Sequence, residues 1–460
     1  MVRKTTITLM ILMPLFVHLG CGLQSSAIEP AADNVKSDKR GRRDPAELAT
    51  QPSAFPASQP AGRPSPTRGW PNWLGPNYDG ISHENDWSSD WPEAGLPIAW
   101  SRQDIGIGFS SVSIANGQLF TMGHIDGKEY VYCLHHNTGK TIWSYSYDCR
   151  LVDNLHEGGP GATPTIDGRF VYTVGREGQL FCFHASNGKI VWGKMMQDDL
   201  NVELAEWGFT CSPYILGNQL IVQGGRVVSY EKLTGKKLWE TEPHNAGYGS
   251  AISFSRQGKT LLATLDCDGL RILNSGDGSQ IAFEPWSSPF FTNSTTPIVV
   301  DDTIFISTGY QVGCGLFRLS DEKLHDGQLE EVYVNREMRN HFNNSILLDG
   351  YLYGFDGNSN LGRVVQLTCM KYDTGEVAWK KSGFGCGSLM IADGKLLILS
   401  DDGTLVLARA TPEQYEELAR SPFLEGRCWT IPVLLNGHIY GRNAAGQLTC
   451  VKLPQKSQPR

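Results

Sequence analysis

Hydrophobic residues along the chain fall in short alternating runs that are separated by turn-forming pairs. Between Ser144 and Trp192 four such runs follow one another: ATPTIDG, RFVYTVGREG, QLFCFHASNG and KIVW. Alternation of this kind predicts short β-strands that bury one face. The Asp-Gly and Asn-Gly pairs between the runs favour tight hairpins, because glycine adopts positive φ at little cost. This stretch therefore predicts one sheet of four short antiparallel strands.

The fourth run of this unit ends in an aromatic residue, and the same ending recurs along the chain. HNTGKTIW, SNGKIVW, LTGKKLW and DTGEVAW end at Trp143, Trp192, Trp239 and Trp379, and a weaker copy, GDGSQIAF, ends at Phe283. The first three steps between these ends are 49, 47 and 44 residues, and the last is 96, about twice as long. We expect Tyr333 in LEEVYVN to fill the missing place. A period of this length is typical of propeller blades.

The first hairpin of the unit occurs eight times. Its turns are expected at Asn116-Gly117, Asp167-Gly168, Gly217-Asn218, Gln257-Gly258, Asp301-Asp302, Asp349-Gly350, Asp393-Gly394 and Asn436-Gly437. The last repeat lacks its fourth strand, whereas LPIAW, Leu96 to Trp100, is a fourth strand with no repeat before it. We therefore predict an all-β fold, an eight-bladed β-propeller of four-stranded antiparallel blades over residues 96–453. The N-terminal strand completes the last blade, which removes the open sheet edges.

Two repeats depart from the pattern. After TLVLARA the seventh repeat reads TPEQYEELARSPF, in which Thr411 and Gln414 form a capping-box pattern and Pro412 occupies the first helical position. We expect a short helix there. The fifth repeat, around Gly309 to Tyr333, is irregular, and we expect a longer loop in it.

The residues before the repeats divide into segments of different composition. Arg3 and Lys4 precede an apolar run that ends in LGCG, a pattern typical of an export signal and too short for a convincing membrane span. We assign residues 1–21 to a signal peptide and place the protein in the periplasm or cell envelope. Two alternatives stay open: Cys21 is lipidated and anchors the chain to a membrane, or the signal is cleaved without lipidation. The proline-rich residues 22–68 are expected to form a disordered linker.

Residues 69–95 contain a Trp-rich stretch, GWPNWLGPNYDGISHENDW. We expect this strap to pack against the propeller, because large aromatic side chains mostly serve burial. A platform for carbohydrate or peptide is the alternative. Residues 454–460 are expected to be a tail.

Charge and topology limit the expected partners. The 460 residues carry 40 Lys and Arg against 48 Asp and Glu, a formal net charge of −8, and no basic run is interleaved with aromatic residues. Nucleic acid is therefore not an expected partner. A closed ring has no free edge strand, so we expect a monomer.

The repeats resemble those of the pyrroloquinoline-quinone (PQQ) repeat family, whose Trp-docking motif ends in Thr-Gly-Lys-x-x-Trp. The resemblance covers Leu96 to Leu453, and WPNWLGPNYDGIS resembles the entry motif of many exported bacterial members. It implies the propeller fold of the quinoprotein alcohol dehydrogenase-like superfamily. The family includes calcium-dependent quinoprotein dehydrogenases and also non-enzymatic lipoproteins, such as the scaffold subunit of the β-barrel assembly machinery. The resemblance therefore leaves the function open.

A ligand of a propeller is expected in the central funnel, lined by the loops that lead into the innermost strands. The candidate ligand-binding residues in these loops are Glu206, Trp207, Arg339, Asn340, His341, Asn343, Asn344, Arg427 and Trp429. A quinoprotein site needs oxygen ligands for Ca²⁺, cationic donors to the quinone and an aromatic face. Glu206 with Asn343 or Asn344 would supply the ligands, Arg339 or Arg427 the donors, and Trp207 or Trp429 the face. MRNHFNNS is the densest polar cluster.

The same loops offer little for catalysis. The parts of these loops nearest the innermost strands, which we call the funnel segments, are GFSSVSI, LHEGGPGATP, AEWGFTCSP, NAGYGSA, FFTNSTTP, MRNHFNNSI, GFGCGSL and GRCWTIP. Outside Glu157 and Glu206, these segments contain no carboxylate that could act as a base. The sequence also has no pair of adjacent cysteines, which some quinoprotein dehydrogenases use beside the cofactor, and no Cys-x-x-Cys-His motif for haem. We assign no catalytic residue, and PQQ and Ca²⁺ are cofactors only of the alternative function.

The cysteine and histidine patterns predict no metal site. Cys133, Cys182, Cys369 and Cys450 occupy one slot of four repeats, so we expect them in separate blade cores. Cys211, Cys386 and Cys428 lie near the starts of innermost strands, where a disulfide between two of them stays open. His135 and His136 are adjacent, so we expect them on opposite faces of a strand.

Two functional hypotheses follow. The first is an exported binding or scaffolding module that takes a protein or a small molecule at its funnel and loops. The second is a quinoprotein-type alcohol or sugar oxidoreductase that depends on PQQ and Ca²⁺.

Overall fold

The computed structural model describes residues 69–456. The expected signal peptide with Cys21, the linker and the last four residues of the tail lie outside these residues. Among the described residues, no helix is both long and apolar enough to cross a membrane.

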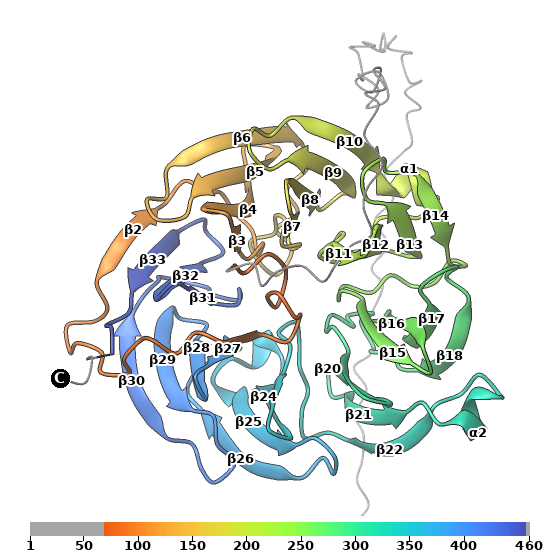
Figure 1. The fold of residues 1–460 in the computed structure, drawn as a ribbon. Coiled ribbons are helices and arrows are strands. Elements are labelled where there is room, and N and C mark those ends of the chain that lie inside the picture. The colour runs from red at the N-terminus through yellow and green to blue at the C-terminus, as the bar shows by residue number, and fades with distance from the viewer. Residues whose placement is uncertain (1–68, 457–460) are drawn as a thin grey trace, which may run out of the picture. The chain divides into compact units, whose positions relative to one another are not determined.

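The chain forms eight sheets arranged around a centre, as Figure 1 shows. The blades are, in chain order: β3 (Ser113–Ala115), β4 (Gln118–Ile125), β5 (Lys128–His135) and β6 (Thr141–Asp148); β7 (Thr165–Asp167), β8 (Phe170–Val174), β9 (Gln179–His184) and β10 (Ile190–Met195); β11 (Tyr214–Leu216), β12 (Gln219–Gln223), β13 (Val227–Glu231) and β14 (Lys237–Glu240); β15 (Ile252–Arg256), β16 (Lys259–Leu265), β17 (Gly269–Asn274) and β18 (Gln280–Pro285). The second half continues with β19 (Ile298–Val300), β20 (Thr303–Thr308), β21 (Gly313–Arg318) and β22 (Glu330–Asn335); β23 (Ile346–Leu348), β24 (Tyr351–Asp356), β25 (Gln366–Lys371) and β26 (Val377–Ser382); β27 (Ser388–Ala392), β28 (Lys395–Leu399), β29 (Thr404–Arg409) and β30 (Glu417–Pro422); β31 (Val433–Leu435), β32 (His438–Arg442), β33 (Leu448–Lys452) and β2 (Ile98–Arg102). The predicted eight-bladed propeller is therefore confirmed.

The ring closes as the sequence predicts, because the N-terminal strand β2 pairs antiparallel with β33 and completes the eighth blade. A buried arginine reinforces this seam between the last and first blades. Arg442, at the end of β32, is 1% exposed and donates to Ser110 O (3.2 Å), Thr121 Oγ1 (3.1 Å), Met122 O and Gly106 O (2.9 Å). Burial lowers the pKa of its guanidinium to about 10. One side chain thus joins strands that are more than 300 residues apart in sequence.

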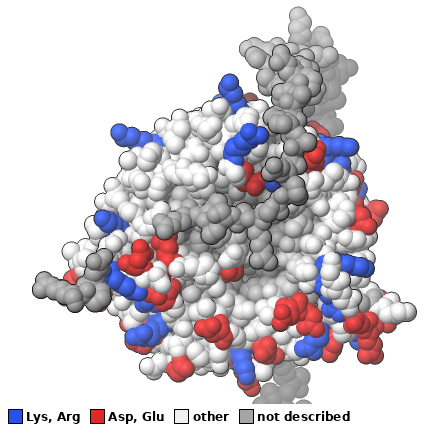
Figure 2. All heavy atoms as spheres, viewed as in Figure 1, with Lys and Arg blue, Asp and Glu red and all other residues white. Residues whose placement is uncertain are grey.

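Consecutive strands of each blade run antiparallel, so their connections alternate between two faces of the ring. Loops between the second and third strands, and loops from one blade to the next, lie on one face, which we call the funnel face. Turns between the first and second strands, and between the third and fourth, lie on the opposite turn face. Figure 2 views one face and shows basic side chains interspersed with acidic ones around the described rim.

Five of the recurring tryptophans each join one blade to the next. Their indole N–H groups donate to a carbonyl of the following blade: Trp100 to His136 (2.8 Å), Trp143 to Ala185 (2.7 Å), Trp192 to Lys232 (2.9 Å), Trp239 to Ser275 (3.0 Å) and Trp379 to Thr411 (2.8 Å). Tyr333 fills the missing place, since its hydroxyl donates to Tyr372 O (2.9 Å). The repeated motif is therefore an inter-blade joint.

The turn glycine of each motif is required by the same joint. At Gly235, φ is +69°, and a β-carbon would lie 2.8 Å from the ring of Trp192. Likewise, a β-carbon at Gly188 would lie 2.7 Å from the ring of Trp143. The absence of a side chain therefore lets the preceding blade's indole rest on the turn backbone.

The helix predicted at Thr411 to Gln414 is wrong, and the segment is an irregular connection that leads into β30. Thr411 O accepts the indole N–H of Trp379, and the ring of Tyr415 packs edge-on against that indole at 5.9 Å. Docking to the neighbouring blade overrides the local helix signal. In the fifth repeat the connection from β21 to β22 is long and contains the short helix α2 (Asp321–Leu324). The other short helices are α1 (Met196–Leu200) and the 3₁₀ segment η2 (Ser359–Val364).

The Trp-rich residues before β2 contact the innermost strands near their turn-face ends. Trp70 exchanges two backbone hydrogen bonds with Ile114 (2.7 and 2.8 Å), and β1 (Ile81–Ser82) pairs in parallel with β27. The Glu84 carboxylate accepts from the backbone N–H groups of Asn436 and Gly437. Trp70 and Trp87 are 2% and 1% exposed. In Figure 1 this orange segment crosses the ring beside β27.

The ten described cysteines are all free and buried. Cys133, Cys182, Cys369 and Cys450 lie on the third strands of four different blades, as expected. Among Cys211, Cys386 and Cys428 no disulfide forms in this structure. Within residues 69–456, no three His, Cys, Asp or Glu side chains gather in a way that could hold a metal ion.

Candidate functional site

Polar side chains at the starts of the innermost strands bond neighbouring blades to one another around the channel. The backbone N–H of Ser111 donates to Thr163 Oγ1 (3.1 Å), and that of Thr163 to Ser212 Oγ (2.9 Å). The series continues from Ser212 to Ser250 Oγ (3.0 Å), from Ser250 to Thr296 Oγ1 (3.1 Å) and from Thr296 to Asn344 Oδ1 (3.0 Å). Six blades are thus linked in series by the same hydrogen bond, from a backbone N–H of one blade to a side-chain oxygen of the next. These polar residues serve the ring and are not free for a ligand.

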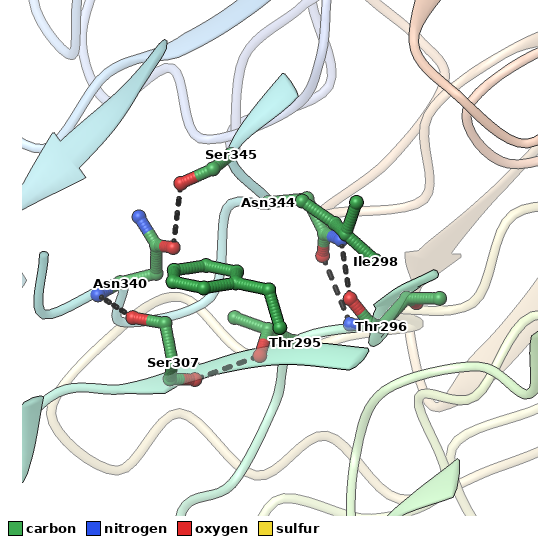
Figure 3. A pocket seen from close by; sticks show the side chains of 8 residues that line it. Thr295, Thr296, Ile298, Ser307, Asn340, Asn344 and Ser345 are labelled. Carbon is green, nitrogen blue, oxygen red and sulfur yellow. Dashed lines mark hydrogen bonds between the residues drawn. The ribbon is translucent and has the colours of Figure 1, made fainter. Parts of the chain in front are cut away.

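A narrow crevice lies where the fifth and sixth blades meet, and Figure 3 shows it closely. The polar groups that line it are hydrogen-bonded to one another. Asn344 Nδ2 donates to Thr296 O (2.8 Å), Ser345 Oγ to Asn340 Oδ1 (2.8 Å), and the Asn340 N–H to Ser307 Oγ (2.9 Å). The crevice leaves no room for a water molecule. It is a packing gap between strands and is too small for a cofactor.

A continuous row of aromatic rings follows the loops of the funnel face around the centre of the propeller. From one end, the centroids step from Trp207 to His156 (5.0 Å), to Trp429 (6.0 Å), to Phe342 (4.6 Å), to His341 (4.9 Å), to Tyr310 (5.0 Å) and to Phe290 (4.8 Å). Phe109 stacks on Trp429 at 5.2 Å with an interplanar angle of 22°. The rings come from seven different loops of the funnel face. We call these eight side chains the aromatic row.

The two histidines of the row are uncharged at neutral pH. Burial lowers the pKa of His341 to about 4 and also lowers that of His156. His341 Nδ1 accepts from the Ser359 N–H (3.2 Å), so its proton lies on Nε2, which faces the Tyr310 hydroxyl at 3.1 Å. His156 Nδ1 likewise accepts from the Gly158 N–H (3.0 Å). The rings of the row are therefore uncharged, and hydrogen bonds fix the orientation of both imidazoles.

One ion pair lies beside the middle of the row. Arg427 places its guanidinium carbon 4.5 Å from the centroid of Trp429, and its Nη1 donates to Glu157 Oε2 at 2.9 Å. Both charged side chains are 35% exposed. The pair ties the entry loop of the second blade to that of the eighth and neutralises the charge of both groups.

Exposed apolar side chains stand in the same loops as several rings of the row. Leu155, next to His156, is 83% exposed, and Phe290 and its neighbour Phe291 are 60% and 54% exposed. Leu361 and Val364 of η2, the loop whose Ser359 bonds His341, are 38% and 70% exposed. Apolar exposure of this kind on one face marks interaction surfaces in soluble proteins.

The candidate residues predicted from sequence separate into two groups. Trp207, His341 and Trp429 belong to the aromatic row, with Glu206 exposed beside Trp207 and Arg427 over Trp429. Asn340, Asn343 and Asn344 instead bond the carbonyls of Phe355, Gly387 and Thr296. Sequence reasoning missed Phe109, Phe342, Tyr310 and Phe290, although three of them stand in the funnel segments, because it searched those segments for polar residues.

The candidate residues do not fit PQQ and Ca²⁺. Arg339 gives Nε and Nη2 to the buried Asp356 (2.6 and 2.9 Å) and Nη1 to Gln311, and Arg427 is paired with Glu157. Trp429 already contacts Phe109, Phe342 and Arg427, so it offers no free face to a quinone. Both candidate donors and the Trp429 ring are thus engaged within the chain, and Trp207 has one ring contact, with His156 at 5.0 Å.

Comparison with known proteins places the fold. The sequence has no match among curated proteins. BamB from Moraxella catarrhalis shares the fold at 17% identity and a TM-score of 0.54, covering 78% of this chain and 100% of that one. Quinohemoprotein alcohol dehydrogenase from Comamonas testosteroni (11% identity, 85% and 82% covered, TM-score 0.61) and a europium-containing methanol dehydrogenase (11%, 82% and 90%, 0.58) are similar as well. At these identities the likeness shows the fold alone.

A family model described as outer membrane protein assembly factor BamB matches residues 127–381. The match spans more than half of the 460 residues and includes the second to fifth blades completely. The chain therefore belongs to the BamB family of PQQ-like repeat β-propellers.

Proposed function

We propose that this protein is an exported binding or scaffolding module that engages a partner protein through the aromatic row and the loops around it. The observation that carries the proposal is the row itself, an uncharged aromatic surface on the funnel face, with Leu155, Phe290 and Phe291 exposed in the same loops. Exposed aromatic side chains on rigid loops are typical anchors of protein interfaces.

The matching family carries the name of an outer membrane protein assembly factor, which supports a role in binding other proteins at the cell envelope. The export-signal pattern of residues 1–21 supports the same location, with lipidation of Cys21 as the proposed anchor. We propose that the ring acts as a monomer. The quinoprotein alternative has only the fold likeness in its favour, because the candidate donors and the Trp429 ring are engaged within the chain.

Site-specific photo-crosslinking in cells tests the proposal. A photoreactive phenylalanine analogue replaces Phe290 on the funnel face, and a matched control replaces Leu238 on the outer strand β14, which is 44% exposed. We expect a discrete adduct with one identified protein from position 290 and none from position 238. That protein, once purified, should bind the wild-type chain and lose affinity for the double variant Phe290→Ser, Phe291→Ser. No adduct at position 290, or equal adducts at both positions, would refute the proposed function.

A further inference from the structure

We propose that the innermost strands of the fourth and fifth blades bind an extended, apolar segment of a partner protein near the turn face. The site is separate from the aromatic row and does not rest on the function proposed for that row. The inference follows from the strap of residues 69–95, which fills the corresponding strand edges of other blades and leaves these two open.

The strap shows that the innermost strands accept extended chain at their inner edge. In an antiparallel pair, alternate residues direct their N–H and C=O groups away from the neighbouring strand. The strap bonds such groups in three blades: Trp70 exchanges two hydrogen bonds with Ile114 (2.7 and 2.8 Å), the Ile166 N–H donates to Pro71 O (2.8 Å), and the Ile391 N–H donates to Gly80 O (3.0 Å). Ile114, Ile166 and Ile391 are each the penultimate residue of their strand. This position therefore faces the centre of the ring.

The same position is open in the fourth and fifth blades, where it is occupied by Ser255 in β15 and by Val299 in β19. Within residues 69–456, neither residue has a backbone hydrogen bond outside its own sheet, and no hydrogen bond joins the strap to either blade. The strap passes from the third blade, where Tyr78 packs on Tyr214 at 4.6 Å, to the seventh, which it reaches at Gly80. It thus leaves the inner edges of β15 and β19 without a strand partner among the described residues.

Side chains on the two open strands are less buried than those on strands that carry the strap. Every residue of β3 and β27 is buried. By contrast, all three residues of β19 are half-buried, and so are Ile252 and Phe254 in β15. Apolar surface that still contacts water favours a partner that covers it. The segment that pairs here is therefore expected to carry apolar side chains.

The site has no net charge for a partner to match. The two turns beside it expose one charge of each sign, on Asp301 and Lys259. Arg256 and Asp302 are already paired within the chain, at 2.6 and 3.6 Å. A charged segment would lose hydration here without gaining a free counterion, so a neutral segment fits best.

The sequence next to the strap is poorly suited to fill these edges. Residues 45–68 carry six prolines, at positions 45, 52, 56, 60, 64 and 66. Proline has no N–H to donate to a neighbouring strand. A strand that pairs with β15 or β19 is therefore better supplied by another protein, in the manner of β-strand addition.

Hydrogen exchange of the full-length wild-type protein tests the inference without any substitution. The probe is a fluorescein-labelled synthetic peptide, Gly-Ser-Val-Ile-Val-Ser-Gly, whose apolar part matches the three residues of β19. In the free protein we expect fast exchange of the Ser255 and Val299 amides and slow exchange of the Ile114 and Ile391 amides, which the strap bonds. A saturating concentration of the probe should slow exchange at Ser255 and Val299 at least about tenfold and leave the outer strand β14 unchanged.

Fluorescence anisotropy then measures how the probe binds. A peptide with N-methyl groups on its three apolar residues, and another with serine in their place, should each bind at least about tenfold more weakly. Val299→Pro removes the inward N–H and should weaken the probe about tenfold, with the melting temperature as the check on folding. The matched control Val299→Ala keeps that N–H and should weaken the probe about threefold or less.

The remaining outcomes would each overturn the inference. Slow exchange of Ser255 and Val299 in the free protein would mean that a second copy or another part of this chain already fills the edges. Equal binding of the N-methylated peptide would contradict strand pairing, and no binding of the probe would contradict the site itself. Loss of binding in the variant Phe290→Ser, Phe291→Ser would place the probe at the aromatic row. The crosslink from position 290 is read independently, so this inference and the proposed function fail separately.

Discussion

The joint between Trp192 and Gly235 gives the sharpest test of how the ring is held together. Both Gly235 and Gly217 lie in turns of the third blade with positive φ, +69° and +60°. A β-carbon at Gly235 would lie 2.8 Å from the Trp192 ring, whereas a β-carbon at Gly217 would meet no atom within 4 Å. Alanine at Gly217 therefore carries only the cost of left-handed backbone, and alanine at Gly235 carries that cost plus a collision with the indole.

The two alanine variants should differ by a measurable free energy of unfolding. Left-handed backbone costs a non-glycine residue about 1–2 kcal/mol, so Gly217→Ala should lose that amount. Forcing a methyl group against a packed ring costs about 1–3 kcal/mol more, so Gly235→Ala should lose about 2–5 kcal/mol. In a Trp192→Ala background the ring is gone, and the cost of Gly235→Ala should fall to that of Gly217→Ala. The coupling between Trp192 and Gly235 is therefore about 1–3 kcal/mol.

Urea unfolding followed by tryptophan fluorescence measures these differences, provided that the slope m is the same in all variants. The cycle needs Trp192→Ala, Gly235→Ala, the double variant, and Gly217→Ala alone and with Trp192→Ala. Equal losses for the two glycines in the wild-type background would refute the reasoning. So would additive losses at Gly235 and Trp192, because the turn would then not depend on the indole.

Three further predictions concern the seam, the pH dependence and the funnel face. Arg442→Met should destabilise the chain by at least about 3 kcal/mol, because it leaves several buried acceptors without a donor. The control Arg409→Met removes an exposed pair with Glu416 and should cost about 1 kcal/mol or less. Equal melting temperatures of the two variants would contradict the role of Arg442 in joining the last and first blades. Burial raises the pKa of the Glu129 carboxyl from 4.5 to about 7, so its stabilising contribution is complete below pH 4.5 and is lost as the pH rises to 7. Relative to Glu129→Gln, the wild type should lose roughly 3 kcal/mol across that window in urea titrations at fixed pH, and parallel pH profiles would refute the assignment. Phe290→Ser with Phe291→Ser should leave the melting temperature within about 1 °C, since both rings are largely exposed, and a large drop would mean that they serve the core instead.

The repeats made the fold predictable from sequence. A turn glycine, a docking aromatic residue and a hairpin turn recur in each unit, so even Tyr333 could be placed by its distance from its neighbours. The helix expected at Thr411 failed for a tertiary reason. The Thr411 carbonyl accepts the indole N–H of Trp379, and the Tyr415 ring packs on the same indole. No local sequence pattern reveals these two contacts with the neighbouring blade.

The site was predictable only in part, because it is assembled from seven loops. Trp207 and Trp429 stand more than 200 residues apart and meet through His156. Each loop contributes only one or two rings, so no single segment shows an aromatic pattern. The asparagines of MRNHFNNS were attractive as ligands, yet the sequence does not tell whether an amide faces a channel or bonds the next blade. Asn344 does the latter, as the acceptor of the fifth bond in a repeated series.

We propose that the funnel is occupied by the chain's own rings and side-chain pairs and works as a protein-binding face instead of a quinone site. Equilibrium dialysis of the full-length protein against PQQ with excess Ca²⁺ tests this claim most directly. We predict no stoichiometric uptake of the quinone and no change in the absorbance of PQQ. One molecule of PQQ bound per chain, with binding lost in Trp429→Ala, would contradict the account.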